Sequence, residues 1–153
     1  MKALMASLLG IGFSIAALAA SLPYDDPGDA HVALRSALVE ARSQNKDVLV
    51  IFGANWCEDC RDLDRAMHGS SASVIDPLFV VVKINVGNFD KNLDLAARYG
   101  NPIQGGIPAA VLVTPTDKVV YSTRAGELAN ARRMGDSGIY DFFSKVVLAH
   151  RSR

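Results

Sequence analysis

Two cysteines lie close together where a predicted buried strand is followed by a predicted helix. Residues 48–52 form an unbroken apolar run, Val-Leu-Val-Ile-Phe, and unbroken rather than alternating apolarity is typical of a strand covered on both faces. Gly53 ends this run, and a helical pattern that includes Cys57 and Cys60 continues to about His68. Because a strand buried on both faces needs neighbouring strands and two helical layers, this junction predicts an α/β sandwich.

The rest of the chain alternates between helical and extended patterns. Apolar residues at helical spacing predict a first helix with Asp29 as its N-cap, a short helix over residues 92–99, and a last helix capped by Asp136 or Ser137. The further predicted elements are a helical turn at 74–78, strands at 79–86 and 109–114, a loop at 101–106, and a hairpin strand at 118–123. The predicted fold is an α/β three-layer sandwich, with a mixed central sheet of four to five strands and helices on both faces. The fifth strand would lie before Asp29, although the prolines of that segment disfavour a strand.

The 153 residues have the length of one domain, and the N-terminus has the pattern of a targeting segment. Lys2 precedes an uncharged stretch over residues 3–20, and residues 17–19, Ala-Leu-Ala, fit the small-x-small pattern at which signal peptides are cleaved. We therefore expect a signal peptide over residues 1–19 and a single domain over residues 20–153, periplasmic or otherwise exported. An uncleaved membrane anchor is the alternative, because about twenty apolar residues span a bilayer.

The charge balance argues against two classes of partner. Lysine plus arginine and aspartate plus glutamate each number 16, so no net charge draws the chain to nucleic acid or to anionic lipid. We expect no nucleic-acid partner and, once the signal is cleaved, no stable membrane insertion.

The two cysteines are best interpreted as a redox pair. A lone cysteine pair in an exported protein often forms a structural disulfide, but a loop closed over two intervening residues constrains the unfolded chain little. A zinc site would need further ligands, and the chain has no third cysteine and only His31, His68 and His150. His31 and His150 are predicted as surface residues near helix ends. We therefore expect no metal, and no cofactor beyond a redox-active disulfide between Cys57 and Cys60.

The predicted helix N-terminus gives the two cysteines different roles. Unpaired backbone N–H groups and the positive end of the helix dipole favour a thiolate at Cys57, and Arg61 follows one turn later. Cys60 lies one turn into the helix and suits a buried resolving thiol. Glu58 and Asp59 lie between the cysteines, and their negative charge disfavours a thiolate, which favours the disulfide and makes the protein a better reductant. Alternatively, these carboxylates are solvated first-turn residues.

Residues 54–61, Ala-Asn-Trp-Cys-Glu-Asp-Cys-Arg, and the later Gly106-Ile107-Pro108 resemble the motifs of the thioredoxin superfamily. The resemblance covers roughly residues 32–147 and is to periplasmic thioredoxin-like thiol:disulfide reductases, of the type of the DsbD carboxy-terminal domain. It implies a thioredoxin-like three-layer sandwich, attack by Cys57, resolution by Cys60, and packing of Trp56 beside them.

The resemblance also implies a partner-binding site around the proline. A cis peptide bond is expected before Pro108, which then faces the cysteines, and the backbone at Ile107 is expected to pair with an extended segment of the partner. A trans proline that opens an edge strand is the alternative.

The sequence departs from the thioredoxin pattern at the buried acid. Ile51 stands where thioredoxins carry this acid, six residues before the attacking cysteine. Asp64 lies four residues after Cys60, on the same helical face, and the resemblance to the DsbD-like domains implies that it replaces the acid as the proton acceptor for the resolving thiol. The alternative is that Asp64 is a solvated surface carboxylate. The loop over residues 99–108 is also longer than in a plain thioredoxin. Because this loop flanks the active site, the identity of the partner protein stays open.

Together these features predict a thiol–disulfide oxidoreductase that exchanges disulfides with partner proteins, as a reductase or isomerase rather than as an oxidase. A reductase outside the cytosol implies a membrane or periplasmic electron donor. The alternatives are a non-redox binding module, such as a chaperone or metallochaperone, and a thiol peroxidase-like enzyme.

Overall fold

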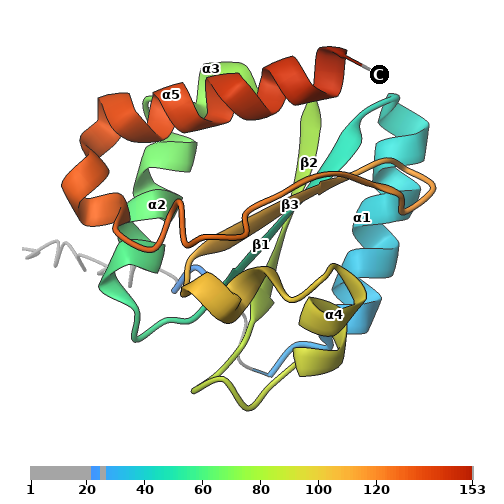
Figure 1. Ribbon diagram of the computed structural model, residues 1–153. Coiled ribbons are helices and arrows are strands. Elements are labelled where there is room, and N and C mark those ends of the chain that lie inside the picture. The colour runs from blue at the N-terminus through green and yellow to red at the C-terminus, as the bar shows by residue number, and fades with distance from the viewer. Residues whose placement is uncertain (1–21, 25–26, 153) are drawn as a thin grey trace, which may run out of the picture.

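A four-stranded mixed sheet forms the centre of the molecule (Figure 1). The computed structural model describes residues 22–24 and 27–152, so the predicted signal peptide at residues 1–19 lies outside the described part. The elements are α1 (Ala30–Gln44), β1 (Asp47–Gly53), α2 (Glu58–His68), α3 (Ala72–Ile75), β2 (Phe79–Asn85), α4 (Leu93–Arg98), the 3₁₀ turn η1 (Pro102–Gly105), β3 (Ala109–Val113), β4 (Val119–Ser122) and α5 (Ala131–Arg151).

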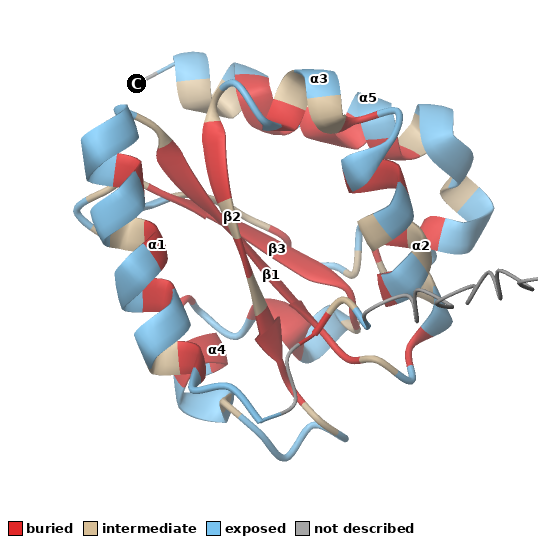
Figure 2. Ribbon diagram, turned by 180° about the vertical axis from the view of Figure 1, so that it is seen from behind, coloured by how far each residue is buried: buried red, intermediate tan, exposed pale blue. Residues whose placement is uncertain are grey.

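The strands lie in the order β2-β1-β3-β4, with β1 parallel to β2 and antiparallel to β3, and β3 antiparallel to β4. Helices α1 and α4 cover one face of the sheet, and α2, α3 and α5 cover the other (Figures 1 and 2). This arrangement confirms the predicted α/β sandwich with a mixed sheet and two helical layers.

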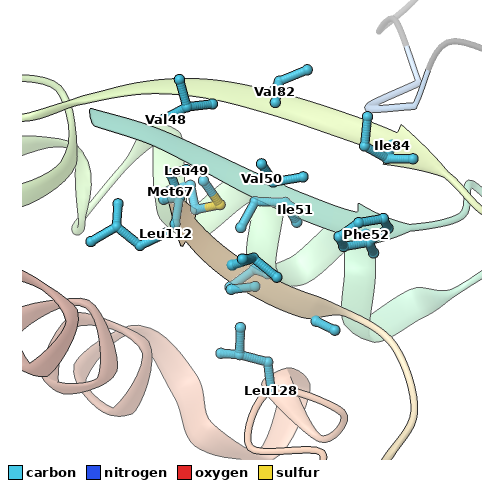
Figure 3. Close-up of a cluster of buried hydrophobic side chains, with 14 of the residues drawn as sticks. Val48, Leu49, Val50, Ile51, Phe52, Met67, Val82, Ile84, Leu112 and Leu128 are labelled. Atoms are coloured by element: carbon cyan, nitrogen blue, oxygen red, sulfur yellow. The ribbon is translucent and has the colours of Figure 1, made fainter. Parts of the chain in front are cut away.

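The core is built around β1, in which all seven residues are buried (Figure 2). Successive side chains of a strand point to opposite faces of its sheet, so β1 contributes apolar groups to both layers of the core. Figure 3 shows Leu49 beside Met67 of α2 on one of these faces. The unbroken apolar run over residues 48–52 is therefore explained by burial of the strand on both sides.

Helix α1 begins where its cap was predicted. The Asp29 carboxylate accepts hydrogen bonds from the backbone N–H groups of His31, at 2.8 Å, and Val32, at 3.1 Å. Two N–H groups that the first turn leaves without helical partners are thereby satisfied.

Two predicted boundaries are wrong. The helical turn lies at Ala72–Ile75 rather than at residues 74–78, and part of the predicted loop at 101–106 forms η1, with Pro102 as its first residue. Helix α5 consists of two helical parts that meet at a kink at Gly135, whose φ of 65° is not helical. The second part follows this kink and carries the predicted apolar face, which agrees with a helix that begins at Asp136 or Ser137. The turn before the kink, over residues 131–134, was not predicted. Among residues 22–24 and 27–29 no strand precedes α1.

His150 lies near the end of α5 as predicted, but it is partly buried rather than fully on the surface. Its Nδ1 lies 2.8 Å from the carboxylate of the buried Asp47, and its ring packs edge-on against Phe79. The last turn of α5 ends over the beginning of β1, and this long-range contact has no signature in the local sequence. His31, at the start of α1, has 45% of its side chain exposed. Within the described residues, no helix is long and apolar enough to cross a membrane.

Candidate active site

The two cysteines lie at the N-terminus of α2, at the end of β1. They are joined by a disulfide, with their Cα atoms 5.2 Å apart. Cys57 is the N-cap of α2, and the backbone N–H of Cys60 donates a hydrogen bond of 3.1 Å to the Cys57 sulfur. Cys57 is 6% exposed and Cys60 is fully buried. An approaching thiol or disulfide therefore meets Cys57 first, and the sulfur it meets lies at the positive end of a helix.

The Ile107-Pro108 segment lies against this sulfur. The Cys57 Sγ is 3.7 Å from the carbonyl oxygen of Ile107, although the two residues are 50 positions apart in the chain. The peptide bond between Ile107 and Pro108 is cis. The residues that the two sequence motifs contributed are thus brought to one place, where the start of β3 passes the start of α2.

A cleft of about 410 Å³ opens over the disulfide. Its lining comprises Trp56, Cys57, Glu58, Asp59, Phe89, Gly106, Ile107, Ala129 and Arg132. Trp56 is 55% exposed, and its indole Nε1–H donates a hydrogen bond of 2.8 Å to the Gly87 carbonyl oxygen, which holds the ring at the rim. Phe89, whose ring centroid lies 6.4 Å from that of Trp56, also lines the cleft and was missed by the sequence reasoning.

A second, apolar groove of about 530 Å³ adjoins the cleft and shares Phe89 and Gly106 with it. Its other lining residues are Leu93, Ala97, Asn101, Ile103 and Gln104, from α4, η1 and their connections. The longer loop noted in the sequence therefore forms one wall of a groove that leads to the disulfide.

The acidic residues between the cysteines are neutralised in part by α5. Arg132 forms ion pairs with Glu58 and with Asp59, and its backbone N–H donates a hydrogen bond of 2.9 Å to the Asp59 carboxylate. Arg61 instead donates to the backbone carbonyl oxygen of Asn55, at 2.6 Å. The carboxylates are thus held at the cleft by a cation that the local sequence did not reveal.

Asp64 follows Cys60 by one turn of α2 and has ion-pair partners of its own. Ile51, at the position of the thioredoxin acid, is buried. Asp64 is partly buried and forms ion pairs with Lys83 of β2 and with His68. Its negative charge is therefore shared with two potential cations from different elements.

A tyrosine that the sequence reasoning missed also lies behind the disulfide. Tyr24 is 2% exposed, and burial raises the pKa of its phenol well above the ordinary value, with the nearby Asp64 carboxylate adding to this effect. No motif marks this residue, since it lies in an irregular segment before α1. Among the described residues, no group of three or more His, Cys, Asp or Glu side chains is arranged to hold a metal ion.

Comparisons with known proteins found a matching family model and similar solved structures. A family model described as thioredoxin-like matches residues 29–115. The crystal structure of a disulphide isomerase from Xylella fastidiosa Temecula1 is similar at 52% sequence identity and a TM-score of 0.80, covering 84% of this chain and 99% of that chain. A structure described as a DsbH oxidoreductase aligns at 20% identity and a TM-score of 0.49, covering 97% of this chain and 96% of that one.

Proposed function

This chain belongs to the thioredoxin-like family and is a protein-disulfide oxidoreductase, and we propose that Cys57 is its attacking thiol and Cys60 its resolving thiol. The observation that carries the proposal is the disulfide at the N-terminus of α2, in which one sulfur borders the cleft and the other is fully buried. A nucleophile must reach its substrate, and a resolving thiol must be shielded from competing substrates.

The reaction follows from thiol–disulfide exchange chemistry. In the reduced protein, the Cys57 thiolate attacks one sulfur of a partner disulfide and forms a mixed disulfide, and the other partner sulfur leaves as a thiolate. Cys60 then attacks the Cys57 sulfur and re-forms the internal disulfide, which releases the partner as a dithiol. Two electrons pass from the protein to its partner. The backbone N–H of Cys60 and the dipole of α2 stabilise the Cys57 thiolate.

The partner binds in the cleft as an extended segment. Ile107 and Pro108 supply a backbone edge beside the reactive sulfur, and pairing with that edge would hold the partner disulfide in line for attack. Trp56 forms the opposite rim, and the adjoining groove suits an apolar side chain of the same segment. Glu58, Asp59, Arg61 and Asp64 have supporting roles, through charge and hydrogen bonds around the cysteines.

The physiological direction we propose is reduction or isomerisation of disulfides in the periplasm or another exported location. The similarity to a protein described as a disulphide isomerase supports this direction over oxidation. A protein that donates electrons there must itself be reduced, so a membrane or periplasmic donor is implied. The disulfide serves as the only redox group that the mechanism needs.

Trapping of partners tests the roles of the two cysteines. In cells that express the Cys60→Ser variant, mixed disulfides between Cys57 and partner proteins should accumulate and should dissolve on treatment with a reducing agent. The matched Cys57→Ser variant should trap far fewer, because its remaining cysteine is buried. Absence of adducts from Cys60→Ser would contradict exchange chemistry and would favour a non-redox binding module.

A further inference from the structure

The segment before α1 is fastened directly to the active-site turn. The side-chain amide of Asn55 donates a hydrogen bond of 2.8 Å to the Tyr24 carbonyl oxygen, and its amide oxygen accepts one of 3.0 Å from the Tyr24 backbone N–H. Asn55 lies two residues before Cys57, so the same turn that presents the cysteines also fixes Tyr24. This double contact explains how a residue outside any helix or strand holds a defined position.

Gly53 leaves room for the Tyr24 hydroxyl beside the resolving cysteine. A Cβ atom on Gly53 would lie 2.1 Å from the Tyr24 hydroxyl oxygen and 3.0 Å from the Cys60 sulfur. The oxygen and the sulfur therefore border the same small space, which the missing side chain leaves open. A side chain at position 53 would push the phenol away from the sulfur.

In its buried environment, the Cys60 thiolate would be stabilised by a hydrogen-bond donor. Cys60 is fully buried, so its thiolate, which must form before it attacks, loses the stabilisation that water gives an anion. Ile51 offers no polar group on the strand behind it. The Asp64 carboxylate lies near Tyr24 and forms ion pairs with Lys83 and His68. Tyr24 is nearly fully buried and its raised pKa keeps it protonated, so its hydroxyl is a donor and not a base.

We propose that the Tyr24 hydroxyl donates a hydrogen bond to the Cys60 thiolate in the reduced protein and thereby accelerates the resolving step. This proposal rests on the proposed function, in which Cys60 resolves the mixed disulfide. The sulfur–sulfur bond to the partner breaks as the Cys57–Cys60 bond forms, and the partner sulfur leaves with the electron pair. The proton that Cys60 loses is regained by the departing partner thiolate, and Tyr24 keeps its own proton throughout.

The test separates the two exchange steps with DTNB, a disulfide that releases a coloured thiolate at each step. In stopped-flow experiments on the reduced protein, the first release reports attack by Cys57 and the second reports resolution by Cys60. Tyr24→Phe removes the hydroxyl and keeps the ring. It should leave the first rate unchanged and slow the second about 10- to 100-fold at neutral pH, the factor expected for loss of a hydrogen bond to a charged group. Tyr140→Phe, at an exposed tyrosine of α5, should change neither rate.

The pH dependence distinguishes this role from a structural one. Above the pKa of the Cys60 thiol in both proteins, the anion forms without help, so the second rates of wild type and Tyr24→Phe should converge. A second rate that Tyr24→Phe leaves unchanged at neutral pH would overturn the proposal. Equal slowing of both steps would also overturn it, since it would show a general disturbance of the site.

A direct titration gives an independent measurement. In the Cys57→Ser background Cys60 is the remaining cysteine, and the ultraviolet absorbance of its thiolate reports its ionisation. Adding Tyr24→Phe should raise the pKa of Cys60, and an unchanged titration would contradict the proposal.

The DTNB experiment also tests the proposed function separately. If the wild-type protein gives no second release of coloured thiolate, Cys60 does not resolve the mixed disulfide, and the proposed function itself fails.

Discussion

The backbone N–H of Arg132 donates a hydrogen bond of 2.9 Å to the carboxylate of Asp59, which lies 73 residues earlier in the chain. The guanidinium of the same arginine forms ion pairs with Asp59 and with Glu58. The first turn of α5 therefore supplies a cation to the acidic pair between the two cysteines. Two carboxylates face one guanidinium, so negative charge at the cleft is reduced but not cancelled.

We expect Arg132→Gln to make the protein a stronger reductant. Removing the guanidinium exposes Cys57 to the full charge of Glu58 and Asp59, which disfavours its thiolate and so favours the disulfide. The contacts are largely exposed, so the reduction potential should fall by no more than about 20 mV. Equilibration of the variant with graded thiol buffers gives the potential. Arg133→Gln is the matched control, because Arg133 is the adjacent arginine and takes no part in these contacts. A rise in the potential of Arg132→Gln would refute the electrostatic argument.

The reduction potential of the wild-type Cys57–Cys60 pair tests the proposed direction of electron flow. Because uncancelled negative charge remains beside Cys57, we expect a value near or below that of thioredoxin, about −270 mV. The measurement is an equilibrium titration of the mature protein against thiol buffers of known composition. A value near about −120 mV would identify an oxidant and would reverse our interpretation of the acidic residues. Absence of a reversible two-electron couple would exclude an exchange enzyme.

We expect Gly53→Ala to destabilise the protein through the Tyr24 ring. The added methyl group would lie 2.1 and 2.4 Å from two atoms of the Tyr24 side chain, and overpacking of this kind costs about 1–3 kcal/mol in the free energy of unfolding. Urea denaturation of the oxidised protein gives this free energy. In a Tyr24→Ala background the same substitution should cost much less, because the ring it meets is gone. Equal costs in both backgrounds would show that Gly53 is needed for another reason.

The cap at Asp29 predicts a stability difference that depends on pH. Hydrogen bonds from the backbone N–H groups of Val32 and His31 hold the pKa of the Asp29 carboxyl below its usual value. A carboxyl whose pKa is lower in the folded than in the unfolded state stabilises the fold above the unfolded-state pKa, about 4. This stabilisation is lost as the pH falls through the folded-state value. The Tm of Asp29→Ala should therefore lie below that of wild type at pH 7, and the gap should narrow in acid.

The control for this cap is Asp29→Asn. Its side-chain oxygen still accepts the hydrogen bonds but carries no charge, so its Tm should lie between those of wild type and Asp29→Ala at neutral pH. A gap between wild type and Asp29→Ala that stays constant from neutral to acidic pH would show that the charge of Asp29 contributes nothing.

The local sequence was sufficient to predict the elements whose stabilising contacts are encoded by neighbouring residues. The apolar run at residues 48–52 specified a strand buried on both faces, because such a run is stable only between two apolar layers. Asp29 specified the start of α1, since a capping side chain acts on N–H groups within three residues of it. The cysteine pair at a strand–helix junction likewise indicated thiol–disulfide chemistry, because the spacing of the cysteines and their position in the helix are local properties.

The tertiary structure determined which distant residues contact these local elements. The contact of Cys57 with Ile107, the pairing of Arg132 with the acidic residues, and the contact of His150 with the buried Asp47 each join residues at least 50 positions apart. The groups near Cys60 likewise come from separate segments, and the Tyr24 hydroxyl and the Cys60 sulfur both border the space that the missing side chain of Gly53 leaves open. Hydrogen bonds and ion pairs act over a few ångströms of space, whereas sequence patterns record only neighbours along the chain. The sequence by itself therefore determined the reactive pair and the sheet that carries it, and the packing of distant segments determined the charge, the access and the hydrogen bonding of that pair.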